Sequence, residues 1–442
     1  MNMFSRQTSC RGSALVVVLW IAFGLVTVAL YFADAMSAEL RAAANRTAGL
    51  TADQAIEGAA RYVSAVLCAF ATNGVVPDPS QYQATAVPVG NARFWIIGRD
   101  PSGAPSTEPL FALIDEGSKL SLNRAGTNLL FALPNITPDF VQAILDWRSS
   151  TGVTLAAVNY ATEDYTAKHA PFETVDELRL VYGATADLLA GDDVNRNGIR
   201  DDNEPDLNHN GLLDPGLLEY FTVFGREPNL HSDGTPLVNV NNRAPLRSLL
   251  RATFGVARAE QILARLTRRS NNGRTTTPLI FSNLLAFYLQ SGMTSAEFAQ
   301  IASAVTASSA NYIYGRVNVN TAGAAVLTCL PGMDATTAQQ LIAYRLQNPD
   351  KLGSIAWVAD ALGNANAIVQ TLAQGDYLTT HSYQFTADIA AVGPYGRGYR
   401  RTKFIFDLSA GAVQVVYRQD LSRLGWALGS KARTTLLAKD TK

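Results

Sequence analysis

Residues 13–33 of this 442-residue chain read SALVVVLWIAFGLVTVALYFA and contain no charged side chain. A run of this length is sufficient for a helix to cross the hydrocarbon core of a bilayer. Arg6 and Arg11 precede the run without an acidic neighbour, and Asp34 follows it at once. This charge distribution predicts that the residues after Asp34 lie outside the cytoplasm. We therefore expect a single-pass membrane anchor carrying a large extracytoplasmic region.

A helix-compatible pattern continues beyond the anchor, without proline, from Ala14 to about Ala71, and Asn73-Gly74 ends it. At 1.5 Å per residue this helix is roughly 85 Å long, which is more than a membrane requires. Its later part places apolar residues between charged ones, as is typical of a helix with one buried face. The apolar positions are Leu50, Ile56, Tyr62, Val63, Val66 and Leu67.

Three interpretations of the N-terminus compete: a cleaved secretory signal, a plain anchor, and a leader cut ahead of the apolar run. Residues 33–35 (Ala-Asp-Ala) are similar to a signal-peptidase site, but the apolar run exceeds the usual signal core. Gly12 instead follows a basic residue and directly precedes the run. This arrangement resembles the class III leader of type IV pilins and pseudopilins, which implies cleavage by a prepilin peptidase between Gly12 and Ser13. Residues 1–12 are then the leader, and residues 13–33 are the transmembrane helix.

Five segments have the composition of β-strands bounded by turns. The two early ones, 93–98 and 110–115, are expected to form a hairpin, and the three late ones are 383–392, 403–408 and 413–418. Two early and three late strands do not form two stable sheets separately. The sequence therefore predicts an α+β fold in which the long N-terminal helix packs on one antiparallel sheet, and a large, mostly helical insertion interrupts that sheet. The expected units are 34–119, 120–380 and 381–442.

The insertion contains a hydrophobic-Asn element in three copies, which predicts an internal repeat. The copies begin at Leu120, Val238 and Val317 and read LSLNRA, VNVNNRA and VNVNTA. Each copy is followed by amphipathic helical sequence, so we expect the element to end a strand and to cap the next helix with a side chain. The third copy continues as TAGAAVLTCLPGMDATTAQQLIAYR, which resembles the helix-hairpin-helix (SAM-like) unit of competence and repair proteins.

Residues 193–204 read DVNRNGIRDDNE, a full match to the calcium-loop pattern D-x-[DN]-x-[DN]-G-x5-E. Calcium takes about six to eight oxygen ligands from a chain that wraps around it, and Gly198 permits the sharp turn. The predicted ligands are Asp193, Asn195, Asn197, the Ile199 carbonyl, Asp201 through water, and Glu204. These ligands are typical of a weak extracellular site, and the alternative is a solvated acidic loop.

A second loop begins 13 residues later, at Asp206. Its position 12 is Leu217, so this loop is incomplete unless Glu219 supplies the last ligand from the following helix. The other predicted ligands are Asp206, Asn208, Asn210, the Leu212 carbonyl and Asp214. Ca²⁺ is therefore the expected cofactor, and its expected role is to hold together loops of like charge.

The leader, the long helix, the split sheet and the repeats together resemble a K-type minor pseudopilin of the type II (general) secretion system, the GspK family, over nearly the whole chain. The fifth residue after the expected cleavage is Val17, where most pilins have Glu. That Glu is thought to pair with the N-terminal amine of the subunit above, and its absence is a recognised feature of the K-type family.

The resemblance implies a non-enzymatic tip subunit that caps the pseudopilus and supports its initiation and protein export across the outer membrane. It also implies I- and J-type minor pseudopilins as partners, and contact with the secretion machinery. The chain would lie in the inner membrane, with its bulk in the periplasm. Calcium binding is known in this family as well.

Two other functions fit parts of the sequence: a tip or minor subunit of a type IV pilus, and a membrane-anchored helix-hairpin-helix DNA-binding protein, whose backbone amides would hold phosphate. A basic stretch favours the latter: Arg243, Arg247, Arg251, Arg258, Arg265, Arg268, Arg269 and Arg274. However, Asp334 stands in the third hairpin, where it would face phosphate, and either the acidic residues 192–206 or a neighbouring subunit would offer the arginines a partner. The net charge of −1 also marks no general nucleic-acid binder. Nucleic acid is therefore not an expected partner.

The sequence contains none of the common zinc-protease, hydrolase or nucleotide-binding motifs, so catalysis is not expected. Cys10, Cys68 and Cys329 lie at no zinc-binding spacing. Once a leader is removed, Cys68 and Cys329 remain as a pair. An oxidising compartment would permit a disulfide between them, and the sequence leaves that pairing open.

Overall fold

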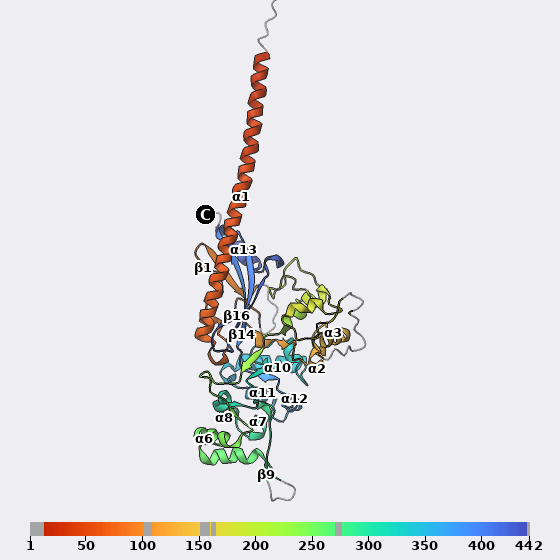
Figure 1. Cartoon of the computed structure of the whole chain (residues 1–442), viewed down its shortest axis with the longest axis vertical. Coiled ribbons are helices and arrows are strands. Elements are labelled where there is room, and N and C mark those ends of the chain that lie inside the picture. Colours follow the sequence, from red (N-terminus) through yellow and green to blue (C-terminus); the bar gives the residue numbers. More distant parts are fainter. Residues whose placement is uncertain (1–12, 101–107, 151–159, 161–164, 270–275, 440–442) are drawn as a thin grey trace, which may run out of the picture.

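Helix α1 (Ser13–Phe70) is one continuous helix of 58 residues, and its first half extends away from the rest of the molecule (Figure 1). The computed structural model describes residues 13–100, 108–150, 160, 165–269 and 276–439. The helix ends where Asn73 (φ 58°) and Gly74 (φ 74°) adopt left-handed conformations, which an α-helix does not tolerate. The predicted long helix is therefore confirmed.

The first half of α1 touches no other part of the described chain. Its large apolar side chains between Leu15 and Phe32 are 49% to 76% exposed. This part of the helix is long and apolar enough to cross a membrane. Gly12, on the leader side of the expected cleavage site, lies outside the described residues. The exposed apolar surface requires a lipid or protein environment outside the folded chain.

The second half of α1 packs on an antiparallel sheet whose strands come from both ends of the chain. The strand order is β1-β2-β14-β15-β16, and β3 also pairs with β14. The bounds are β1 (Val87–Val89), β2 (Ala92–Ile97), β3 (Ile114–Asp115), β14 (Gln384–Val392), β15 (Arg400–Asp407) and β16 (Gln414–Asp420). The predicted α+β architecture, one split sheet on a long helix, is confirmed. A short C-terminal helix, α13 (Gly429–Lys439), lies near the turn that joins β14 to β15.

The predicted hairpin between the two early strands is wrong. Strand β2 pairs with β1 and with residues 388–392 of β14, whereas β3 pairs with Phe385 and Thr386 farther along the same strand. A single bridge, Ile97 to Phe111, joins the two early segments. Strands β2 and β3 therefore lie one after the other beside β14. The reason is that β14 offers each of them a longer edge for pairing than they offer each other.

The two faces of the sheet are covered differently. Phe94, Phe385, Ile389 and Phe406 face the buried side of α1, in a core that includes Ile56, Ala59, Val63 and Leu67. The alternate residues of β14 point to the other face, where Ala390 and Val392 pack with Trp95 and Leu428, and where Gln384, Thr386 and Asp388 are buried polar residues. This polar half of the sheet faces the insertion.

The chain between β3 and β14 forms short helices joined by two-stranded ladders. The helices are α2 (Thr127–Phe131), α3 (Pro138–Arg148), α4 (Ala186–Ala190), α5 (Leu217–Tyr220), α6 (Arg243–Arg265), α7 (Leu284–Ser291), α8 (Ser295–Ile301), α9 (Ala324–Thr328), α10 (Ala335–Gln347), α11 (Ala356–Leu362) and α12 (Ala367–Leu372). The strands are β4 (Leu120–Ser121), β5 (Phe221–Thr222), β6 (Arg226–Pro228), β7 (Val238–Asn239), β8 (Thr267–Arg269), β9 (Thr276–Pro278), β10 (Val305–Thr306), β11 (Tyr312–Tyr314), β12 (Val317–Asn318) and β13 (Leu378–Thr379). Helix α6 lies at the end of the molecule opposite the anchor (Figure 1).

The three repeat copies have the same construction. Each hydrophobic-Asn element forms a two-residue strand that pairs in parallel with a strand closing its unit: β4 with β5, β7 with β10, and β12 with β13. The fourth residue of each element is an Asn whose side-chain N–H donates to a distant backbone carbonyl. Asn123 donates to Phe172 (2.9 Å), Asn241 to Phe281 (2.9 Å) and Asn320 to Leu352 (3.0 Å). The predicted helix capping by the element is therefore wrong. The helices that follow have Gly126, Asn242 and Gly323 as their N-cap residues, and none of these side chains caps its helix.

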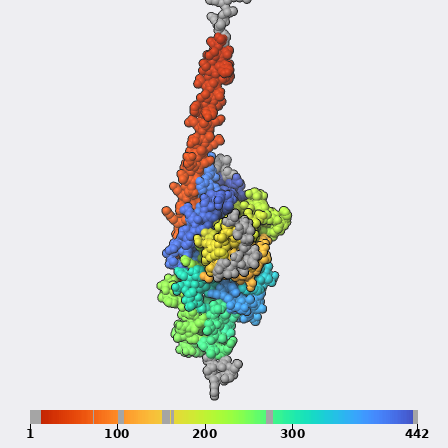
Figure 2. Space-filling view, turned by 45° about the vertical axis from the view of Figure 1, so that its right-hand side comes forward, coloured from red at the N-terminus to blue at the C-terminus, as the bar shows by residue number. Residues whose placement is uncertain are grey.

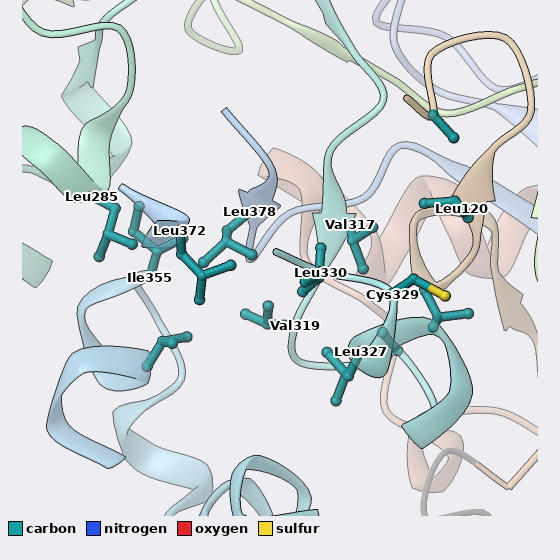
Figure 3. Close-up of a cluster of buried hydrophobic side chains, with 14 of the residues drawn as sticks. Leu120, Leu285, Val317, Val319, Leu327, Cys329, Leu330, Ile355, Leu372 and Leu378 are labelled. Atoms are coloured by element: carbon teal, nitrogen blue, oxygen red, sulfur yellow. The ribbon is translucent and has the colours of Figure 1, made fainter. Parts of the chain in front are cut away.

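A tight turn recurs in each copy, although the sequence revealed a hairpin only in the third. Asn135 (φ 58°) lies between α2 and α3, Gly255 (φ 77°) interrupts α6, and Gly332 (φ 79°) lies between α9 and α10. The copies share one apolar core, in which Leu285 of the second copy approaches Ile355 and Leu372 of the third (Figure 3). This core is separate from the one under α1.

Replacement of Leu67 by Ala tests the packing of α1 on the sheet. Leu67 is fully buried, so the change should lower the free energy of unfolding by about 2 to 4 kcal/mol through lost burial and a cavity. The control is Leu50→Ala on the same helix, where the side chain is 60% exposed and the loss should stay below about 0.5 kcal/mol. Urea unfolding of the purified chain in detergent measures both, and equal effects would contradict this packing.

Candidate metal centre

The first loop, residues 193–204, is closed by the two carboxylates at its ends. The Asp193 carboxylate accepts the backbone N–H groups of Asn197 (2.9 Å) and Gly198 (2.8 Å). The Glu204 carboxylate accepts those of Asn195 and Asp201, both at 3.1 Å. The loop backbone therefore wraps around a group of acidic oxygens, as a calcium loop does.

The second loop repeats this conformation. Asp206 accepts the backbone N–H groups of Asn210 and Gly211, both at 3.1 Å, in the same way as Asp193 in the first loop. Position 4 has a positive φ in both loops (Arg196 56°, His209 58°), and so does the glycine at position 6 (Gly198 79°, Gly211 76°). The shared sequence pattern thus produces one backbone fold twice.

Inside each loop, two asparagines bind an aspartate. The Nδ2 atoms of Asn195 and Asn197 donate to Asp201 Oδ2 at 2.6 and 2.8 Å, and Asn208 and Asn210 bind Asp214 in the same way at 2.6 and 2.7 Å. The Asn195 Oδ1 atom is buried without a hydrogen-bond partner. Rotation of these amides would direct their oxygens inward in place of the N–H groups, so the donor set fits a cation that prefers oxygen. Within the described residues, no three acidic, histidine or cysteine side chains already converge as a metal cluster.

Burial distinguishes the two loops. Asp193, Asn197 and Ile199 are at most 3% exposed, whereas Asn208 and Asn210 of the second loop are exposed. Burial raises the pKa of the Asp193 carboxyl, and Arg99 opposes this shift only in part. Burial also raises the pKa of Glu204. The first loop therefore holds acidic groups in an environment that disfavours their charge unless a cation joins them.

Glu219 does not close the second loop as predicted. Its carboxylate forms an ion pair with Arg99 (2.8 Å), beside the first loop. Asp192 instead accepts the backbone N–H groups of Leu207 (3.0 Å) and Asp214 (3.2 Å), and it is 1% exposed. Asp192 thus holds the second loop much as Glu204 holds the first. Sequence reasoning missed it because it lies next to Asp193 and outside the repeated pattern.

The third hairpin and part of the basic stretch, which favoured DNA binding, make contacts within the chain. Asp334 caps α10 by accepting the Thr337 N–H at 2.7 Å, so a carboxylate lies where phosphate would bind. Arg251 pairs with Glu260 (2.7 Å), which Arg247 also approaches (3.4 Å), and Arg258 pairs with Glu297 (2.8 Å). These three arginines therefore pair with carboxylates of the second repeat and not with residues 192–206 as expected.

A cavity of about 730 Å³ lies where the end of α1 meets the insertion, and Cys68, Glu227, Arg316 and His381 are among the residues lining it. Burial raises the pKa of Glu227 to about 7, although Arg316 opposes the shift. Cys68 is exposed, Cys329 is buried, and both are free thiols in the structure. The disulfide that the sequence left open is therefore not formed here.

No protein-family model matches the chain, and no curated protein matches it in sequence. Among solved structures, it is similar to a chain of the GspK-GspI-GspJ complex from the type 2 secretion system of enterotoxigenic Escherichia coli. The sequence identity is 10% and the TM-score is 0.36, over 89% of this chain and 98% of that chain.

Proposed function

We propose that the chain is a non-enzymatic minor pseudopilin of the type II secretion system. It caps the tip of the pseudopilus, supports its initiation and so supports protein export across the outer membrane. The observation that carries this proposal is the division of α1 into a bare apolar half and a half packed on a split sheet. A simple anchor needs no second half, whereas a filament subunit uses the first half to pack with its neighbours.

Residue 17 supports a position at the tip. A carboxylate in an apolar environment is costly unless it is paired. A pilin with Glu at this position meets the N-terminal amine of the subunit above, whereas Val17 offers no such partner and is 56% exposed on α1. A subunit placed above this chain would leave its amine without a countercharge.

The insertion supports the same position. It is larger than the sheet domain that carries it, has its own apolar core, and extends beyond the end of α1 away from the anchor (Figure 1). Repetition of this bulk along a closely packed helical filament would cause clashes, whereas one copy at the end has free space. The sides of α1 and of the sheet then face the I- and J-type minor pseudopilins. Before assembly, α1 would anchor the chain in the inner membrane, and the rest of the chain would lie in the periplasm.

Calcium is the proposed structural cofactor. Asp193, Asn195, Asn197, the Ile199 carbonyl, Asp201 and Glu204 would hold one ion. Asp206, Asn208, Asn210, the Leu212 carbonyl and Asp214 would hold a second, with Asp192 beside them. Each ion would supply positive charge to a loop whose side chains are mainly acidic or neutral.

N-terminal sequencing of protein extracted from membranes tests the leader. The mature chain should begin at Ser13, because a prepilin peptidase would cut after Gly12. Gly12→Val should remain uncut, whereas the control Gly24→Val, which meets no neighbouring atom in the middle of the anchor, should be processed normally. A mature N-terminus at Ala35 or beyond would contradict the pseudopilin assignment.

Titration calorimetry with calcium tests the loops in the purified full chain. Asp193→Ala and Glu204→Ala should each weaken binding at the first loop by more than about tenfold, because each removes a charged ligand. Asp202→Ala is the matched control, since it removes the same charge from an exposed position of the same loop that supplies no ligand. Equal affinities in all four proteins, or no binding by the wild type, would exclude a calcium site in this loop.

Immunogold labelling of assembled pseudopili tests the place of the chain in the filament. An antibody against the insertion should label one end of each filament, because the insertion blocks repetition along its length. An antibody against the major pseudopilin provides the control and should label the whole length. Gold particles spaced along the filament with the first antibody would show that the tip position is wrong.

A further inference from the structure

The first loop is held by a buried arginine of the sheet. Arg401 of β15 is 0% exposed, and its guanidinium binds the Asp388 carboxylate of β14 at 2.8 and 2.6 Å. Its remaining N–H groups donate to the backbone carbonyls of Asn195 and Arg196, the latter at 2.6 Å. Positions 3 and 4 of the loop therefore complete the hydrogen bonding of a buried ion pair.

Two other segments of the sheet domain contact the same part of the loop. Arg99, which follows β2, donates to the Arg196 carbonyl at 2.8 Å and binds Glu219. A Cβ atom placed on Gly198 would lie 2.8 Å from the Arg99 side chain, so loop and arginine are in close contact. The Asn195 Nδ2 atom also donates to the Trp426 carbonyl at 3.3 Å. The first loop is thus a direct contact between the insertion and the sheet.

The second loop provides an internal comparison. It has the same backbone conformation, but the hydrogen bonds recorded for it are internal or come from Asp192 and Arg200 of the same segment. The sheet contacts therefore do not follow from the loop pattern itself. They depend on Arg401 and Arg99, which lie outside the insertion.

Burial makes the Arg401 contacts energetically important. Burial alone would lower the pKa of Arg401, but the Asp388 carboxylate raises it above the usual arginine value, so the guanidinium stays charged. The N–H groups that Asp388 does not use then require acceptors, because an unsatisfied donor on a buried charge is costly. The two loop carbonyls are these acceptors, and Arg196, which carries one of them, has a left-handed φ of 56°.

We propose that the first loop is a calcium-dependent clamp that fixes the insertion on the pilin-like sheet, with Arg401 and Arg99 as positioning residues. The clamp rests on the proposed calcium binding, and it links that binding to the docking of the loop on the sheet. A cation that draws Asp193, Asp201 and Glu204 together stabilises the loop conformation that presents the two carbonyls to Arg401. By reciprocity, docking of the loop on Arg401 raises the affinity for the cation by the same factor.

Calcium calorimetry on the full chain tests this linkage in a background with Asp206→Ala, which disables the second loop. In this background Arg401→Gln and Arg99→Gln should each weaken calcium binding about tenfold, although neither residue is a ligand. The matched control is Arg226→Gln. Arg226 also joins the insertion to the sheet, through Asp407 at 2.5 Å, but its recorded contacts include no loop residue, so calcium affinity should not change.

Hydrogen exchange gives a second readout. Removal of calcium with a chelator should increase amide exchange in the first loop and in the surrounding junction of the wild-type chain, and calcium should restore protection. The Arg99→Gln variant keeps the Arg401–Asp388 pair, so it remains informative if Arg401→Gln does not fold.

The outcomes separate the clamp from calcium binding itself. Absence of calcium binding by the wild-type chain would overturn both. Normal calcium affinity in a folded Arg401→Gln or Arg99→Gln variant would overturn the clamp but not the calcium site. The same conclusion would follow if Arg226→Gln lowered calcium affinity as much as these two variants do.

Discussion

Strand β14 is buried on both faces along its whole length, and the arrangement of the molecule depends on this constraint. Its odd-numbered residues from Phe385 to Ala391 are apolar and pack under α1. Its even-numbered residues Gln384, Thr386 and Asp388 are polar and equally buried. Buried polar groups require partners, and the chain between β3 and β14 supplies two of them: Glu116 binds Thr386, and the Arg226 N–H binds Gln384. The sheet is therefore completed by the segment that divides it.

Glu116 shows how charges are paired where the insertion meets the sheet. It follows β3, where the chain leaves the sheet, and it accepts the hydroxyl groups of Thr222 from the first repeat (2.5 Å) and Thr386 from β14 (2.7 Å). Burial would raise its pKa, but Lys119 and Lys403 lower it to about 2, so the carboxylate remains charged. Asp176 extends the polar contacts, since it accepts from Gln419 of β16 at 2.8 Å, and Figure 2 shows its segment against the late strands. Buried charges and hydrogen bonds thus join the insertion to the sheet at several points.

The sequence alone predicts those parts of the fold that depend on residues close together in the chain. The length of α1, the late strands and the two loop conformations follow from apolar periodicity, turn residues and the D-x-N-x-N-G pattern, because each depends on neighbouring residues. Pairings that depend on the tertiary fold were not predictable. Strand β3 pairs with β14 instead of β2, Asn123 holds a carbonyl 49 residues away, and Arg251 binds Glu260. Asp192 was missed for the same reason, because its acceptor role depends on residues 15 and 22 positions later.

The contrast between the two loops shows how one local pattern acquires two environments. The second loop lies at the surface, where water solvates its charges. The first lies against Arg401 and Arg99, and its acidic groups lose solvation but gain fixed positive neighbours. An apolar junction of the same extent would tolerate many orientations of the insertion, since hydrophobic contact is not directional. Buried hydrogen bonds to two specific carbonyls permit far fewer. A polar junction therefore suits the proposed position of the insertion at the end of a filament, and a cation in the first loop would keep the direction of the insertion fixed.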